Sequence, residues 1–213
     1  VLITCTLTYW YQGVQAAVEL VRKKFGNIPI ILGGVYATLC PEHAQSQSGA
    51  DLILTGPGEN QILRILQEID GKDQFKSKNE LPVFPDFDSL PSPAYELSHN
   101  TSVLALLTSR GCPFHCSYCA SRLLYQRFEQ RQPEKVAAEI EYFRQNLGTE
   151  QIAFYDDALL INKNHHLIKI LEALTDSKEK WRFHTPNGLH PREFDWELAR
   201  WLKISGFDSL FLS

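Results

Sequence analysis

Short apolar runs rich in β-branched residues alternate with segments of helical periodicity along most of this chain, and this alternation limits the fold more than any other feature. The run from Val1 to Thr8 precedes a segment from Gly13 to Phe25 in which apolar residues recur at helical spacing. The same change occurs between residues 151–155 and 164–174. Because strands separated by helices usually join into a parallel sheet, the sequence predicts an α/β fold with ligands at the carboxyl ends of the strands.

The alternation occurs in two regions, which are separated by a stretch of different composition. Residues 1–70 and 101–213 alternate, whereas residues 71–100 contain scattered charges followed by several prolines and show little periodicity. We therefore predict two domains, joined by an extended linker at 71–100. The second region holds successive strand–helix steps that amount to about half of a (β/α) barrel, with four such units.

Charge and hydropathy exclude some classes of partner. The chain has 213 residues and a formal net charge of -4, which does not favour duplex nucleic acid but leaves room for a local basic groove for RNA. No apolar run approaches the roughly 18 residues needed to cross a bilayer, and the first residues lack the basic segment of a signal peptide, so we expect no membrane partner. The chain contains no Met and both ends fall within strand-like runs, so we expect an internal piece of a longer protein.

Three of the five cysteines lie close together in the sequence, at Cys112, Cys116 and Cys119. Their spacing is C-x3-C-x2-C, directly after a strand-like run at 103–108. An odd and clustered set of cysteines indicates reduced thiols that bind a metal, and hence a cytoplasmic protein. Three thiolates on one loop can hold three irons of a [4Fe-4S] cluster and leave the fourth iron open for chemistry.

A structural zinc site is the main alternative for this cysteine motif. Zinc needs four ligands, commonly two C-x2-C pairs, whereas Cys5 and Cys40 lie in the other region of the chain. His115 could complete a zinc site, but its position inside the tight loop makes tetrahedral closure awkward. The ligand set therefore favours an iron–sulfur cluster over zinc.

The segment around these cysteines resembles the signature of the radical S-adenosylmethionine (SAM) enzymes, including the aromatic Tyr118 just before the third cysteine. The resemblance implies that Cys112, Cys116 and Cys119 ligate a [4Fe-4S] cluster whose open iron chelates the amino and carboxylate groups of SAM. It also implies that an electron from a reductase, flavodoxin or ferredoxin breaks the sulfonium bond, giving methionine and a 5′-deoxyadenosyl radical. Residues 101–213 would then form a partial radical SAM barrel.

The same resemblance implies SAM contacts at neighbouring strand ends. Asp156 and Asp157 follow the second barrel strand, where the family contacts the SAM amino group, although either could instead cap the next helix. Asn187 follows the third strand and corresponds to the loop near the SAM ribose. Tyr118 is expected to lie against the adenine, with packing within the loop as the alternative.

Residues 1–70 resemble the carboxyl half of a Rossmann-like cobalamin-binding domain, as found before the radical SAM barrel in many bacterial enzymes. Paired glycines follow a buried strand, and glycines at such a place let the backbone approach the nucleotide tail of the cofactor. A Cys-Thr-Leu segment stands where the family usually has Ser-x-Leu. The residues that would contact cobalamin are Thr6, Gly33, Gly34, Gly56 and Gly58.

The motif D-x-H-x-x-G, which supplies the axial histidine of cobalamin in the family, does not occur in this chain and would lie upstream of Val1. His43 is in the wrong place for that role, and we expect it to be a solvated helix residue. A flavodoxin-like domain without cobalamin is therefore the alternative for residues 1–70.

These observations lead to one functional hypothesis with two alternatives. We expect a radical SAM enzyme, with a [4Fe-4S] cluster, SAM and cobalamin as cofactors, that carries out cobalamin-dependent methyl transfer or a related radical reaction. The alternatives are methylthiolation or rearrangement without cobalamin, and an iron–sulfur electron-transfer or scaffold protein without enzymatic activity. The sequence identifies neither the substrate nor the catalytic residues. In such enzymes the substrate contacts usually come from later strands and a carboxyl-terminal domain, which we expect beyond Ser213.

Overall fold

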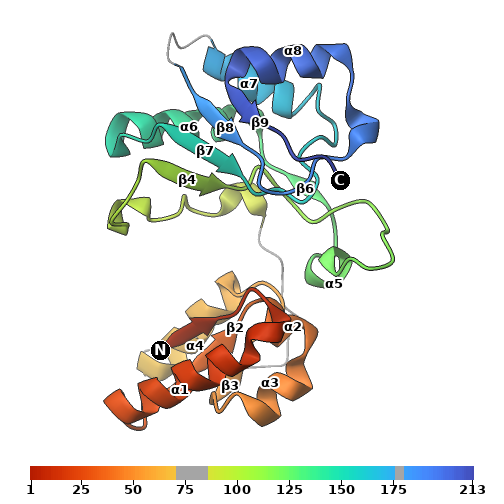
Figure 1. Ribbon diagram of the computed structural model, residues 1–213. Helices are drawn as coiled ribbons and strands as arrows, with labels where there is room; N and C mark the ends of the chain where they lie inside the picture. The colour runs from red at the N-terminus through yellow and green to blue at the C-terminus, as the bar shows by residue number, and fades with distance from the viewer. Residues whose placement is uncertain (71–85, 176–179) are drawn as a thin grey trace. The chain divides into compact units, whose positions relative to one another are not determined.

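The computed structural model describes residues 1–70, 86–175 and 180–213, which form two compact units (Figure 1). The first unit runs from Val1 to Pro85 and the second from Asp86 to Ser213. Of the predicted linker, residues 71–85 lie outside the described residues, and residues 86–100 belong to the second unit. Each unit has its own hydrophobic core.

The first unit is built on a parallel sheet whose strands are adjacent in chain order. The strands are β1 (Leu2–Thr4), β2 (Ile31–Gly33) and β3 (Leu52–Ile53). The helices are α1 (Tyr11–Phe25), α2 (Val35–Leu39), α3 (Pro41–Gln47) and α4 (Glu59–Asp70). Val14 and Val18, one helical turn apart on α1, pack with Leu32 of β2 in the core, as the periodicity predicts.

The first predicted strand is shorter than expected, because the chain turns after Thr4. The Cys5 amide bonds to the Gly33 carbonyl, and the Cys5 carbonyl accepts from the Tyr36 amide. The chain then forms a 3₁₀ turn, η1 (Thr8–Trp10), before α1. This turn leaves the carboxyl end of β1 beside the start of α2.

The second unit is built on a four-stranded parallel sheet with strands again in chain order (Figure 1). The strands are β4 (Val103–Leu106), β7 (Gln151–Phe154), β8 (Arg182–His184) and β9 (Phe207–Ser209). The helices that follow them are α6 (Pro133–Leu147), α7 (Leu167–Thr175) and α8 (Trp196–Ser205), and α7 contacts both α6 and α8. Three of the four predicted strand–helix steps are therefore present, and within the described residues β9 is the fourth strand without a following helix. The carboxyl ends of these strands lie at one edge of the sheet.

A small antiparallel ribbon frames the cysteine segment. Strand β5 (Ser109–Arg110) pairs with β6 (Glu129–Gln130), so the residues between them, which include α5 (Ser121–Leu124), form a closed loop. The sequence predicts one strand over 103–108, but β4 ends at Leu106. The amides of Thr108 and Ser109 donate to the side chain of Asp156, just after β7, instead of continuing the backbone ladder.

The segment before β4 covers the outer edge of the sheet. It contains two 3₁₀ turns, η2 (Phe87–Ser89) and η3 (Tyr95–Leu97). The Tyr95 hydroxyl donates to the Ala105 carbonyl of β4 at 2.5 Å, and its ring packs edge-on against Phe143 of α6. These contacts satisfy part of an edge strand that would otherwise be open.

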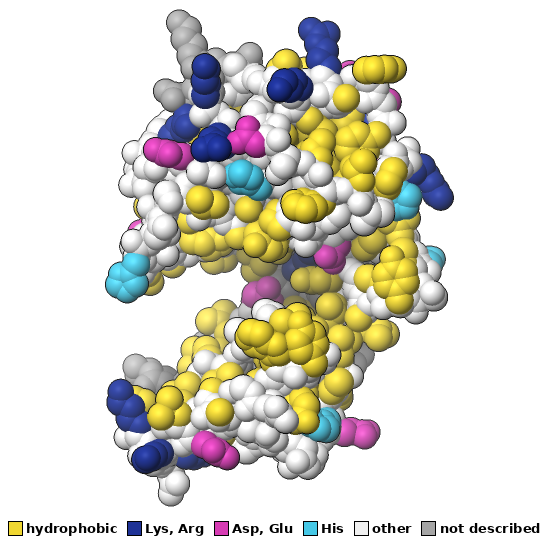
Figure 2. All heavy atoms as spheres, in the orientation of Figure 1, with side chains coloured by type: hydrophobic (Ala, Val, Ile, Leu, Met, Phe, Trp, Pro, Cys, Tyr) yellow, Lys and Arg dark blue, Asp and Glu magenta, His cyan; other side chains and the backbone are white. Residues whose placement is uncertain are grey.

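Hydrophobic side chains also reach the surface of both units (Figure 2). In the first unit Tyr9 and Trp10 of η1 are exposed just beyond the carboxyl end of β1. Among the described residues, no helix combines the length and the apolar character that a bilayer span requires.

Candidate functional site

The second unit contains a cavity of about 560 Å³ at the carboxyl edge of its sheet. It is lined by the cysteine loop, the turn after β7, the loop after β8 and Ser213. All three predicted cluster ligands line this cavity, together with three of the predicted SAM contacts, Tyr118, Asp157 and Asn187. Residues separated by more than 70 positions in the sequence thus meet at one site, as expected for neighbouring parallel strands.

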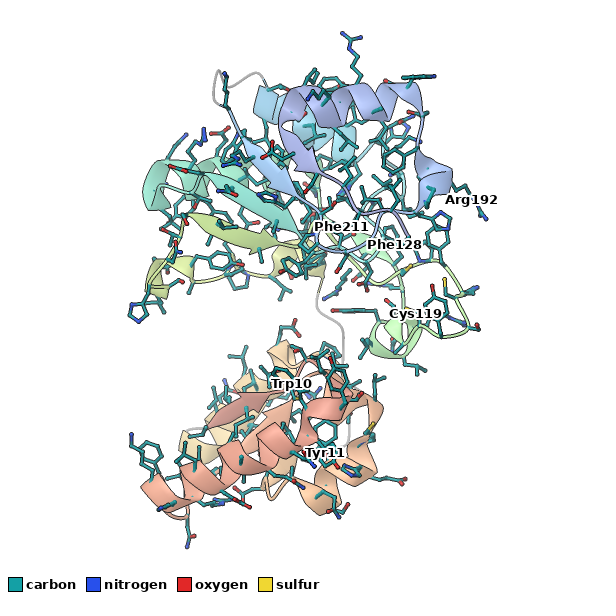
Figure 3. All side chains as sticks on the ribbon, in the orientation of Figure 1. Trp10, Tyr11, Cys119, Phe128, Arg192 and Phe211 are labelled. Atoms are coloured by element: carbon teal, nitrogen blue, oxygen red, sulfur yellow. The ribbon has the colours of Figure 1, made fainter. Side chains whose placement is uncertain are left out.

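The cysteine loop presents three free thiols to this cavity. Cys112 is half-buried, whereas Cys116 and Cys119 are exposed, and the Cys119 amide closes a turn on the Cys116 carbonyl at 3.1 Å. Burial raises the pKa of the Cys112 thiol, and the nearby Asp157 carboxylate acts in the same direction. Figure 3 shows Cys119 on the segment that precedes α5.

Gly111, directly before the first cysteine, gives the start of the cysteine loop a backbone conformation that favours glycine. Gly111 has a φ of +76°, and a Cβ at this position would lie 2.6 Å from the Arg127 carbonyl oxygen at the far end of the loop. Only glycine combines this backbone conformation with so close an approach. The first cysteine is therefore held near the point where the loop closes.

The donor set of this cavity suits an iron–sulfur cluster. Three thiols on one loop can bind three irons of a [4Fe-4S] cluster, whereas a structural zinc ion requires a fourth protein ligand. Within the described residues, no three His, Cys, Asp or Glu side chains converge closely enough to form a ready-made site for a single metal ion. The three thiols share a cavity of about 560 Å³ with Asp157 and Asn187.

The two adjacent aspartates have different surroundings. The Asp156 side chain does not line the cavity; the residue is 3% exposed, and its carboxylate accepts hydrogen bonds from Thr108 and Ser109. Burial raises the pKa of Asp156, while these hydrogen bonds oppose the rise. Asp157 lines the cavity and accepts a hydrogen bond of 2.7 Å from the Ser121 hydroxyl.

Neither aspartate caps a helix, so that alternative is wrong. The next helix, α7, begins only at Leu167, after a series of turns. Asn187 lies beside the same strand end, where its Nδ2 donates to the Tyr155 carbonyl at 2.7 Å and to the Asp156 carbonyl at 3.3 Å. The loop after β8 is thereby tied to the end of β7.

Tyr118 is 91% exposed, so the alternative of packing within the loop is wrong as well. Phe114 supplies the aromatic packing instead, because its ring lies 4.7 Å from the His190 ring. His190 belongs to the loop after β8, just before η4 (Pro191–Glu193), which carries Arg192 (Figure 3). This ring contact joins the cysteine loop to the loop that bears Asn187.

Sequence reasoning missed the residues that hold the cysteine loop in place. Thr108 and Ser109 bond to Asp156, and Ser121 bonds to Asp157. Arg110 forms an ion pair with Glu129 across the β5–β6 ribbon, and its guanidinium lies 5.0 Å from the Phe87 ring centre. The only available signal was the run of hydroxyl and cationic residues immediately before Gly111.

In the first unit, the predicted cobalamin contacts lie at or near the carboxyl ends of the strands. Gly34 has a φ of +90°, and a Cβ there would lie 2.7 Å from the Cys5 carbonyl oxygen, so the packing of the unit itself requires this glycine. The Gly56 amide donates to the Thr38 hydroxyl at 3.0 Å. Thr6 is exposed. A Cβ at Gly33 or Gly58 would have no atom closer than 3.9 Å.

His43 is a helix residue at the surface, as expected, but its ring also contacts other side chains. His43 is exposed on α3, but its Nδ1 lies 2.7 Å from the Tyr36 hydroxyl and its ring packs against Tyr11. It is a surface residue that contributes to the packing between α1, α2 and α3.

Several known proteins are similar to this chain. A methyltransferase of Pyrococcus horikoshii that is described as uncharacterised is 27% identical over 184 residues, which cover 76% of this chain and 40% of that protein. The anaerobic magnesium-protoporphyrin IX monomethyl ester cyclase of Synechocystis is 23% identical over 164 residues, covering 67% of this chain and 33% of that protein. The chain thus spans less than half the length of these curated relatives.

A solved structure shares the fold. The radical S-adenosylmethionine methyltransferase TsrM from Kitasatospora setae, determined with its tryptophan substrate and a SAM analogue, has a TM-score of 0.63 and 16% identity. The match covers 97% of this chain and 46% of that protein. Residues 106–213, which contain the cysteine loop and the other segments that line the cavity, match the family described as the radical SAM superfamily. The chain therefore belongs to the radical SAM superfamily of enzymes.

Proposed function

We propose that this chain forms the part of an enzyme that binds a [4Fe-4S] cluster through Cys112, Cys116 and Cys119 and cleaves SAM. The observation that carries the proposal is the meeting of three thiols, Asp157 and Asn187 in one cavity at the carboxyl edge of a parallel sheet. When bound, the reduced cluster supplies the electron that breaks the sulfonium bond of SAM to give methionine and a 5′-deoxyadenosyl radical.

The residues of the cavity have separate tasks in this proposal. Asp157 offers a carboxylate oxygen to the ammonium group of SAM, because charge-assisted hydrogen bonds are the stronger kind. Asn187 orients the loop near the ribose through its bonds to the backbone after β7. The exposed Tyr118 ring offers a face on which the adenine can stack.

Apolar residues form one part of the cavity wall and would keep water from that side. Ala158, Leu159 and Leu189 are buried residues of its wall. A wall of this kind protects a reactive carbon radical from side reactions, which is the usual purpose of excluding solvent. The chain's own contribution is therefore binding, orientation and shielding.

The cluster assignment is tested by anaerobic reconstitution of the full-length protein. We expect about four irons per chain and the broad visible absorbance of an iron–sulfur cluster, together with 5′-deoxyadenosine when SAM and a reductant are added. Cys116→Ala should abolish these signals. Cys40→Ala, which changes a partly buried cysteine of the first unit, is the matched control and should retain them. Unchanged iron content and spectrum in Cys116→Ala, or bound zinc in place of iron, would contradict the assignment.

We further propose methyl transfer with cobalamin as the overall reaction. The names of the Pyrococcus relative and of TsrM support methyl transfer. The parallel sheet of the first unit, with exposed Tyr9 and Trp10 beyond β1, supports a flat cofactor at its carboxyl edge. The experiment is to supply SAM with a labelled methyl group and ask whether the label appears on cobalamin retained through gel filtration.

A radical reaction other than methyl transfer is the second candidate. The similarity to the protoporphyrin ester cyclase favours it, since that name describes ring closure. The two candidates differ in the fate of the label. Formation of 5′-deoxyadenosine without any labelled cobalamin or labelled product would favour the second candidate.

A further inference from the structure

The Asp156 carboxylate is the most heavily hydrogen-bonded side chain around the cysteine loop. Its Oδ1 accepts from the Thr108 amide at 3.0 Å, the Thr108 hydroxyl at 2.8 Å, the Ser109 amide at 2.5 Å and the Ser109 hydroxyl at 2.6 Å. Its Oδ2 lies 3.2 Å from the same Thr108 amide. Thr108 and Ser109 are fully buried. Because no water reaches these donors, each depends on the carboxylate for its hydrogen bond.

This carboxylate continues the sheet after its backbone ladder has ended. The Tyr155 amide bonds to the Leu106 carbonyl at 2.9 Å and is the last such bond between the ends of β4 and β7. One residue further on, the Asp156 side chain takes the place of a backbone acceptor for two successive amides. Cys112 follows Ser109 after only two intervening residues, so this junction sets the direction in which the loop leaves the sheet.

The next residue holds the other end of the cysteine segment. Asp157 accepts from the Ser121 hydroxyl, and Ser121 lies two residues after Cys119. Asn187 in turn donates to the Asp156 carbonyl. Consecutive residues after β7 are therefore attached to both sides of the segment that carries the thiols.

We propose that Asp156 is a positioning residue that fixes the start of the cysteine loop so that the three thiols reach one cavity, and that it is not a SAM ligand. One part of this proposal, the effect of Asp156 on retention of the cluster, rests on the proposed function. The geometric part of the proposal concerns only the protein and can be tested without the cluster. Asp157, which lines the cavity, is left as the carboxylate that meets SAM.

The first test compares Asp156→Asn with Asp195→Asn in the full-length protein without cluster. Asp195 caps α8 by accepting from the Leu198 amide, pairs with Lys163 and does not line the cavity, so its substitution controls for the loss of one carboxylate charge. We expect amide hydrogen exchange over residues 108–119 to accelerate at least about tenfold in Asp156→Asn but not in the control. Equal exchange in both variants would overturn the proposal. This outcome does not depend on whether any cluster binds.

The second test follows cluster retention. We expect a chelator to remove iron from reconstituted Asp156→Asn about ten times faster than from the wild type, as is usual when a partner beyond the direct ligands is lost. The reduced cluster should also give an altered electron paramagnetic resonance spectrum. A wild-type rate and spectrum combined with weaker SAM binding would make Asp156 a SAM ligand and overturn the proposal. A wild-type protein that takes up no iron would instead refute the proposed function, while the exchange experiment still decides the role of Asp156.

A milder pair of variants guards against misfolding of Asp156→Asn. Thr108→Val removes one hydroxyl donor at almost constant volume, whereas Thr108→Ser keeps the donor. We expect Thr108→Val to show faster exchange and faster iron loss in the same direction, and Thr108→Ser to behave as the wild type. If both variants match the wild type, the hydrogen bonds to Asp156 do not position the loop.

Discussion

His166 is a buried imidazole whose environment disfavours its charged form. The residue is 2% exposed, and neither ring nitrogen has a hydrogen-bond partner within the described part of the chain. Burial lowers its pKa to about 4 and outweighs the opposing influence of the nearby backbone of Arg131 and Thr108. The folded protein therefore holds this ring mainly neutral at neutral and mildly acidic pH.

This pKa predicts how the stability of the second unit depends on pH. The unfolded state binds a proton at His166 below about pH 6.5, whereas the folded state does so only below about pH 4. The unfolded state thus binds more protons between these values, so the free energy of unfolding falls as the pH drops through this window, by up to about 3 kcal/mol. Above pH 6.5 the residue contributes no pH dependence.

Urea unfolding of the wild type and His166→Leu between pH 7 and 5 measures this effect. As the pH falls, the unfolding free energy of the wild type should decrease more than that of His166→Leu, which lacks the titrating ring. Carboxylates titrate mostly at lower pH and affect both proteins alike. A difference that stays constant over this range would contradict the buried neutral ring.

At the scale of elements, the β5–β6 ribbon depends on an ion pair that is largely shielded from water. The side chains of Arg110 and Glu129 are 5% and 15% exposed, and the Arg110 Nε lies 2.5 Å from Glu129 Oε2. Arg127 donates to the other oxygen of Glu129 at 2.7 Å. Removing the carboxylate charge would take this ion pair from an Arg110 guanidinium that is only 5% exposed.

Glu129→Gln is therefore expected to lower the free energy of unfolding of the second unit by roughly 2–4 kcal/mol. The control is Glu172→Gln, which breaks a surface ion pair with Lys169. The Lys169 side chain is 53% exposed and the Glu172 side chain 38%. That change should cost less than about 0.5 kcal/mol. Denaturant unfolding at low and high salt gives both values, and equal costs for the two variants would refute the shielding of the ribbon.

The elements also show what the sequence could and could not predict. The order of the main strands and helices follows from periodicity, because α1, α6, α7 and α8 each bury apolar residues in a core. The β5–β6 ribbon was missed, since each of its strands consists of two polar residues and no apolar run marks it. The different roles of Asp156 and Asp157 could not be predicted either, because the partner of each carboxylate comes from a segment more than 35 positions away.

At the scale of the whole molecule, the candidate site belongs to one unit. The three thiols, Asp157 and Asn187 all lie within Asp86–Ser213, which has its own core and its own sheet. We therefore predict that residues 86–213, produced alone, take up iron with the same dependence on Cys116 as the full-length protein. They should not retain cobalamin, because its predicted contacts lie in the first unit.

Iron analysis and cobalamin retention on this shorter protein test whether the second unit binds iron and the first unit binds cobalamin. The full-length protein and the Cys116→Ala form of the shorter one are the two references. Iron uptake that needs residues 1–85, in a shorter protein whose circular dichroism shows a folded state, would contradict the assignment of the site to the second unit alone.

The tight contact at Gly34 shows that a glycine pair after a strand can be required by packing alone. A side chain there would collide with the Cys5 carbonyl and the Thr4 hydroxyl, so this glycine would be needed even in a protein that binds nothing. Its presence is therefore a marker of strand–helix geometry and a poor marker of cofactor binding. Gly58, whose Cβ would meet no atom within 4 Å and whose backbone is unstrained, has no such internal reason. Positions of that kind are the better diagnostic when domains like this one are classified.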